Sequence, residues 1–264
     1  MLKLIVTNQT VMRAYLLIVL LSLFAQPLLS QELPRWRPGN VGLQLGLNSD
    51  RYAAMSMDYM RAYAKQTSLI DLELGAMQQE VISRVEGGMM VLSVGLHPLS
   101  QDGNTYNLNH ELRFALELHA GRESMILWNE AGSSNSLIYC VIQNEAALNA
   151  AYLFRHSRFG IIEFYGGLGA GLGKTFGNEF IFINDTDRSF AGEQNTVYNE
   201  SVFRAVGSSF YRVYVPAGMD LRVFGKLKVN VEARYGVGAE KVKDDRLYMI
   251  PGTFAAIVGM KYLI

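Results

Sequence analysis

Strict alternation of apolar and polar residues is the feature that most limits the folds open to this chain. In the segment 226–240, apolar residues occupy the odd positions, and charged residues, asparagine and glycine occupy the even ones. The segment 211–223 alternates in the same phase, and Phe224-Gly225-Lys226 leaves room only for a tight turn. Successive side chains of a β-strand point to opposite faces, so this period predicts two long strands, each with one apolar face and one polar face.

Earlier and later segments repeat the pattern. Further strands are predicted at 41–48, 52–62, 70–74, 112–119, 144–154, 159–174 and 253–264. Several exceed the roughly 9–11 residues with which a tilted strand crosses a bilayer. Short connections (155–158 and 224–226) alternate with long ones (121–143, 175–207 and 241–252), while 98–109 is intermediate. Pro216 cannot donate a hydrogen bond to a neighbouring strand, so we expect a bulge there.

This combination predicts a transmembrane barrel. After the first thirty residues no segment offers 18 consecutive apolar residues, which excludes a helical membrane protein. Barrels of this type pair short periplasmic turns with longer outer loops and have an even number of strands. We therefore expect an all-β fold, an antiparallel transmembrane β-barrel of eight to ten strands with meander topology. The alternatives are a soluble sandwich, which also alternates, and a soluble lipocalin-like barrel with the apolar face inside.

The first thirty residues predict an export signal. Residues 14–25 form an apolar run of about a dozen residues preceded by Arg13, which fits a signal core and is too short for a membrane-spanning helix. Ser30 and Ala25 are the two candidate cleavage points, and either Met1 or Met12 serves as the start. We expect residues 1–30 to be the signal peptide and residues 31–264 the barrel. The alternative is an N-terminal membrane anchor.

Composition removes several classes of function. Lys+Arg and Asp+Glu are equal at 24 each, so no basic surface suggests nucleic acid. The chain has 1 cysteine and 4 scattered histidines, a set that predicts neither a disulfide nor a metal site. We therefore expect no cofactor.

A glycine run at 166–173 resembles a nucleotide-binding loop only superficially. A phosphate loop ending in Gly173-Lys174-Thr175 requires glycine at 168, where the chain has leucine. The glycines at 167, 169, 171 and 173 instead recur every second residue on one strand face. We expect them to leave room for bulky side chains from opposite walls, or to permit sharp curvature of the sheet.

The polar faces carry charges of both signs, which predicts a barrel interior (the lumen) crossed by ion pairs, because an unpaired buried charge is costly. The predicted lumen network consists of Asp71, Glu73, Glu111, Arg113, Glu117, His119, Glu163, Arg212, Asp220, Arg222, Glu232 and Arg234. In a barrel of about eight strands such side chains can fill the interior. The functional alternative is a catalytic group, for which His119 beside Glu117 is the best candidate because histidine titrates near neutrality.

The C-terminal residues carry a family resemblance. Gly259, Tyr262 and Ile264 resemble the signal by which outer-membrane barrels are recognised for insertion, although that signal usually ends in an aromatic residue. The segments 165–174 and 215–222 are similar to strands of the OmpA/OmpX-like outer-membrane β-barrel class. The resemblance implies outer-membrane lipid, the barrel-assembly machinery and a periplasmic chaperone as partners. It implies no catalytic residue.

For function, the sequence favours a non-enzymatic barrel with a structural or surface-interaction role, including a place in an envelope or transfer apparatus. The segment 175–207 is the best candidate for a surface that contacts a protein partner, because long loops are usually functional or disordered. The alternatives are a narrow channel for small solutes and a membrane-embedded enzyme that uses lumen carboxylates and His119.

Overall fold

The computed structural model describes residues 35–51, 62–63, 77–81, 84–99, 107–130, 136–158, 160–185, 199–242 and 247–264. The predicted signal peptide, the predicted strand at 70–74 with Asp71 and Glu73, and most of the predicted strand at 52–62 lie outside these residues. Of that last segment only Ala62 is described, and Ala62 and the following Tyr63 are helical. No helix in the described part of the chain is long and apolar enough to cross a membrane.

The described residues form ten strands. They are β1 (Trp36–Arg51), β2 (Met77–Val81), β3 (Arg84–Pro98), β4 (His110–Glu130), β5 (Ser136–Arg158), β6 (Ile162–Asp185), β7 (Asn199–Arg204), β8 (Ser209–Phe224), β9 (Leu227–Lys241) and β10 (Leu247–Leu263). The chain divides into a small unit of residues 1–37 with 98–107 and a large unit of residues 38–97 with 108–264. In the small unit, the Leu99 amide donates to the Arg35 carbonyl at 2.8 Å. The large unit contains the sheet.

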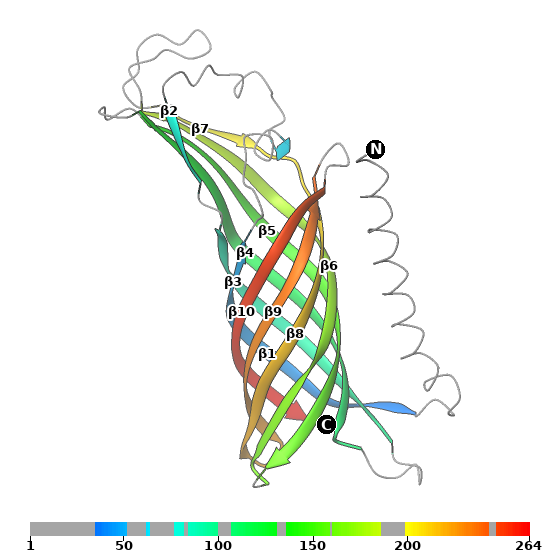
Figure 1. Ribbon diagram of the computed structural model, residues 1–264. Coiled ribbons are helices and arrows are strands. Elements are labelled where there is room, and N and C mark those ends of the chain that lie inside the picture. The colour runs from blue at the N-terminus through cyan, green and yellow to red at the C-terminus, as the bar shows by residue number, and fades with distance from the viewer. Residues whose placement is uncertain are drawn as a thin grey trace, which may run out of the picture. The chain divides into compact units, whose positions relative to one another are not determined.

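In the large unit the sheet closes on itself. The strand order is β4-β3-β1-β10-β9-β8-β6-β5, and β5 returns to pair with β4 (Figure 1). Of the ten strands, β2 pairs with the outer part of β4 and β7 with the outer part of β6, which leaves eight strands in the ring. The first and last strands join through an unbroken antiparallel register from Asn40↔Leu263 to Arg51↔Gly252. The predicted meander barrel of eight to ten strands is confirmed.

The two faces of the ring have the polarity of a membrane protein. On β9, Val231, Tyr235 and Val237 are exposed on the outside, whereas Glu232 and Arg234 are buried inside. Apolar side chains outside and charges inside are the reverse of a soluble barrel. Closure also satisfies the backbone groups between strands, as a bilayer requires. The lipocalin-like alternative is therefore wrong.

The apolar outer face is tall enough to cross a bilayer. On β10, Phe254 and Tyr262 both face outward, and the stretch from one to the other, both included, is nine residues long, enough for a tilted strand to cross a bilayer. Tyr211 and Tyr235 also face outward, and aromatic residues on this face are typical of the membrane interfaces of such barrels. Tight turns follow β5 and β8, with Gly160 (φ 71°) and Gly225 (φ 52°) in the left-handed region. Short turns mark the periplasmic side, so this end of the ring is called the periplasmic end, and the opposite end the outer end.

Several predicted connections are wrong because the strands are longer than expected. β4 continues to Glu130 and β5 begins at Ser136, so most of the predicted 121–143 connection is strand. β10 begins at Leu247, inside the predicted 241–252 connection. The predicted link at 155–158 belongs to β5, and the turn lies just beyond Arg158. The polar residues at 155–158 resembled a turn in composition, but Arg155 is polar because its side chain lies in the charged lumen.

The predicted loop at 175–207 is also mostly strand. β6 runs to Asp185, and the apolar run Phe180–Ile183 pairs with β7. This apolar run therefore extends the sheet at the outer end. Only residues 186–198, between β6 and β7, lie outside the described strands of this hairpin.

The prediction of a bulge at Pro216 is wrong. Pro216 pairs with Arg234 on β9 without a change of register. On the other side, pairing with β6 lapses opposite Gly167 and Leu168 and resumes in the same register. The hydrogen bond that proline cannot donate is therefore missing between β8 and β6, and neither strand contains the extra residue of a bulge.

The glycine run makes room for bulky side chains, as predicted, but these come from neighbouring strands and not from opposite walls. A Cβ at Gly169 would lie 2.5 Å from the Tyr214 ring, and one at Gly173 would lie 2.3 Å from the Phe210 ring. Both rings are on β8, directly across from these glycines. Glycine therefore allows two inward-facing aromatic rings to lie flat against the wall.

Candidate functional site

The candidate site is the charged lumen, and the strand alternation explains how it forms. Residues of the same parity on each strand face inward, so polar positions from all eight strands converge on one axis. The predicted residues that face the lumen are Glu111, Arg113, Glu117, His119, Glu163, Arg212, Asp220, Glu232 and Arg234. Arg222 lies at the rim, with its side chain 43 % exposed. Asp71 and Glu73 lie outside the described residues.

Glu232 is the centre of the middle part of the lumen. Its carboxylate contacts Arg113 from β4, and its other oxygen lies 2.5 Å from Arg234 Nε. The Tyr165 hydroxyl donates a hydrogen bond to Glu232 at 2.6 Å. Arg234 also pairs with Glu117 from β4, so this cluster joins opposite walls of the ring.

Arg155 is the centre of the cluster at the periplasmic end. It pairs with Glu111 and Asp220, and its Nη2 lies 2.9 Å from Glu163 Oε2. Lys261 from β10 approaches Asp220 with 2.9 Å between Nζ and Oδ1. Because Glu111 also lies 3.0 Å from Arg113 Nε, the periplasmic and middle clusters are continuous.

Glu163 extends this cluster to the rim. Its Oε1 lies 2.6 Å from Lys228 Nζ and 3.9 Å from Arg222. Between Lys228, Arg155 and His97 there is a cavity of about 40 Å³. A water molecule needs at least about 10–15 Å³ of such space, so the cavity has room for water but not for a larger solute.

A third cluster occupies the outer part of the lumen. Asp50 from β1 lies 2.6 Å from Arg122 and 2.8 Å from Arg212. Glu145 pairs with both arginines, at 3.0 Å from Arg212 Nη2. Each charge therefore has at least two partners of the opposite sign.

His119 and Glu117, the candidate pair of the catalytic alternative, form no hydrogen bond with each other. His119 Nε2 lies 3.6 Å from Glu117 Oε2, beyond hydrogen-bond distance, and neither ring nitrogen has a hydrogen-bond partner. Glu117 is already paired with Arg234. Among the described residues, no group of three or more His, Cys, Asp or Glu is placed to hold a metal ion.

The prediction missed several members of the network. They are Asp50, Arg122, Glu145, Arg155 and Lys261. Parity identifies Asp50 and Lys261, because each continues the inward set of its strand. Arg122 was hidden by a bulge between His119 and Arg122 that changes the phase of the alternation on β4. Glu145 has the same parity as the other inward residues of β5, so parity identifies it as well.

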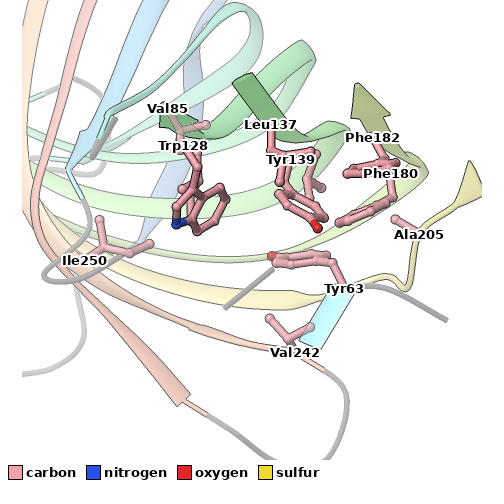
Figure 2. Packing of buried hydrophobic residues seen from close by; sticks show 12 residues of the cluster. Tyr63, Val85, Trp128, Leu137, Tyr139, Phe180, Phe182, Ala205, Val242 and Ile250 are labelled. Atoms are coloured by element: carbon pink, nitrogen blue, oxygen red, sulfur yellow. The ribbon is translucent and has the colours of Figure 1, made fainter. Parts of the chain in front are cut away.

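Above the outer cluster the inner face becomes apolar. Trp128, Tyr139, Phe180 and Phe182 come from the outer parts of β4, β5 and β6 and pack together, with Tyr139 and Phe182 ring centroids 5.0 Å apart (Figure 2). Tyr63 inserts its ring beside them. This set and its neighbours are called the outer apolar cluster.

Tyr63 links the outer apolar cluster to the charged lumen. Its hydroxyl donates a hydrogen bond to Glu240 on β9 and accepts one from Gln143 at 3.4 Å. Its carbonyl accepts a hydrogen bond from the Val206 amide at 2.9 Å. Glu240 also accepts a hydrogen bond from Ser208 at 2.5 Å. Among the described residues, a hydrogen-bonded polar layer thus lies beneath the packed aromatic rings at the outer end of the lumen.

No family model matches the sequence, and no curated protein matches it. The solved structures that are similar include the following three. The Neisserial surface protein A matches 87 % of this chain and 99 % of its own, with 11 % identity and a TM-score of 0.39. OprG from Pseudomonas aeruginosa matches 86 % and 96 %, with 8 % identity and a TM-score of 0.41. Ail from Yersinia pestis matches 86 % and 100 %, with 14 % identity and a TM-score of 0.36. At these identities the likeness concerns the fold alone.

Proposed function

We propose that this barrel of the outer membrane of a Gram-negative bacterium is a non-enzymatic, closed barrel with a structural or surface-contact role. The observation that carries the proposal is the continuous ionic network of the lumen. It runs from Lys228 at the periplasmic end through Arg155, Glu111 and Arg113 to Glu232. A solute would have to break several buried ion pairs to pass, and each is costly to break.

Single-channel recording tests the closed lumen. We expect the purified barrel, reconstituted in a planar bilayer, to show no steady conductance at any salt concentration. The control is the same bilayer with lipid alone, and the incorporated protein is checked by its heat-dependent band shift on gels. Steady openings that scale with salt concentration would support the narrow-channel alternative instead.

The long outer strands support the surface-contact part of the proposal. β4, β5 and β6 contain 21, 23 and 24 residues, whereas a tilted strand needs about 9–11 to cross a bilayer. The excess lies at the outer end, where β2 and β7 add to the sheet (Figure 1). The β6–β7 hairpin thus replaces the predicted 175–207 loop as the surface we propose for a partner in the envelope or in a transfer apparatus.

Site-specific photo-cross-linking in cells tests this surface. A cross-linker at Val202 on β7, which is 55 % exposed, should give a discrete adduct with a second protein. The matched control is Val223 near the periplasmic turn, 57 % exposed on the lipid-facing side, where we expect none. If position 202 gives no adduct, or both positions give the same one, the surface-contact role is wrong.

The role of Gly259, Tyr262 and Ile264 as an insertion signal, and with it the barrel-assembly machinery as a partner, stays a prediction. Tyr262 faces outward next to Val41 and Leu227. Packing also explains why residue 259 is a glycine, since a Cβ there would lie 2.3 Å from the Leu43 carbonyl oxygen.

A further inference from the structure

A groove lies on the lipid-facing side of the barrel, over β4, β5, β6 and β8. Its walls are the apolar side chains of Leu116, Leu148, Leu172 and Tyr211. Small residues at 146, 147 and 173 form its floor and leave a space of about 320 Å³. That volume is within the range of ligand-binding clefts, roughly 300–1,000 Å³.

The outer end of this groove is polar and basic. Lys174 and Ser209 line it and pair with each other across β6 and β8. Ser209 in turn pairs with Lys241 on β9, so two lysines and a serine form one row on three neighbouring strands. Lys174 is exposed, and among the described residues it has no ion-pair partner.

The row lies in the outer part of the apolar face. On the outer face of β6, Leu168 and Leu172 are exposed apolar residues, Lys174 is the next outward-facing side chain towards the outer end, and the exposed Phe176 follows it. On β8 the corresponding step is from Tyr211 to Ser209. Lysine at the end of a membrane-spanning segment extends its ammonium to the level of the lipid headgroups.

We propose that this groove binds one lipid with an anionic phosphate headgroup. An acyl chain occupies the apolar groove, and the phosphate accepts hydrogen bonds from the Lys174 ammonium and the Ser209 hydroxyl. Lysine binds phosphate as a point charge, and basic pockets at the membrane surface bind anionic headgroups in this way. The proposal requires the barrel to lie in a membrane but does not depend on whether the lumen conducts.

A second lipid-facing groove provides an internal control. It lies at the periplasmic end, has a volume of about 290 Å³, and is lined by Val41, Leu43, Leu227, Met260 and Tyr262. The nearby Lys226 already places its ammonium over the Tyr262 ring, 5.9 Å from the centroid. A favourable cation–π contact therefore competes with a phosphate for this lysine.

Native mass spectrometry of the full barrel, released from neutral detergent micelles, tests the proposal. With phosphatidylglycerol as the probe, we expect one lipid to stay bound to the wild-type barrel, and phosphatidylcholine to bind less. Lys174→Gln should lower the apparent affinity by about fivefold, since one lysine near an anionic lipid contributes about 1 kcal/mol. Lys226→Gln removes the same charge at the other rim and should leave the affinity within twofold.

A second variant separates the groove from the charge. Ala146→Phe fills the floor on the lipid-facing side and should abolish lipid retention with Lys174 intact, and the heat-dependent band shift checks that this variant is folded. Equal binding of the two lipids, or equal losses for Lys174→Gln and Lys226→Gln, would overturn the proposal. So would full competition by inorganic phosphate with normal retention in Ala146→Phe, because the site would then bind the ion alone.

Discussion

Replacing Glu232 by glutamine is expected to lower the free energy of unfolding by about 3–5 kcal/mol, the cost of removing one partner from a buried ion pair. Glu232 is 2 % exposed and contacts Arg113 and Arg234, and it accepts a hydrogen bond from Tyr165. Glutamine keeps the shape but leaves two buried guanidinium groups short of a negative charge. Arg234 keeps Glu117 and Arg113 keeps Glu111, so these secondary pairs limit the loss.

Urea unfolding of the barrel in lipid vesicles, followed by tryptophan fluorescence and by the heat-dependent band shift, measures this loss. Arg222→Gln is the matched control, because its side chain is 43 % exposed at the rim and 3.9 Å from Glu163. We expect that variant to stay within about 1 kcal/mol of the wild type. A loss for Glu232→Gln as small as that of the control would mean that the lumen is hydrated and that its charges are screened.

The sequence predicted which face each residue occupies better than it predicted where each strand ends. Parity depends only on strand geometry, so the outward position of Tyr235 and the inward position of Arg234 followed from the alternation. Beyond the membrane the inner face changes from charged to apolar, as Trp128 and Tyr139 show. Both faces are then partly apolar, the contrast between them weakens, and strand was mistaken for loop.

The pairing inside the lumen could not be predicted for a different physical reason. Alternation shows that Arg113 and Glu232 point inward, but their contact joins β4 and β9, which are not neighbours in the ring. Such a contact depends on the stagger between strands and on the tilt that closure imposes. The segment 155–158 was predicted to be a connection for a related reason. The end of a strand that faces a polar lumen has the same polar composition as a turn, and Arg155 lies at such an end.

Replacing Val258 by arginine is expected to destabilise the barrel by about 2–4 kcal/mol, as for a basic residue near the bilayer midplane. Val258 is 54 % exposed on the outer face of β10, midway between Phe254 and Tyr262. Its partners on the neighbouring strands are Leu45 and Val231, which are also exposed and apolar. An arginine at position 258 has no partner of opposite charge among these neighbours. Its side chain must extend to a membrane interface, and the midplane is the depth that lies farthest from both interfaces.

The same urea titration in vesicles measures the effect, and the turn after β8 offers the control. Phe224 is 82 % exposed at the periplasmic end, where Phe224→Arg should cost about 0–1 kcal/mol because the depth-dependent penalty vanishes near the interface. An exposed valine in water tolerates arginine within about 0.5 kcal/mol, so a soluble barrel would give two equally small values. A large loss at 258 combined with a small one at 224 therefore reports the depth of each residue in the bilayer, whereas equal losses would show that the apolar face does not contact lipid.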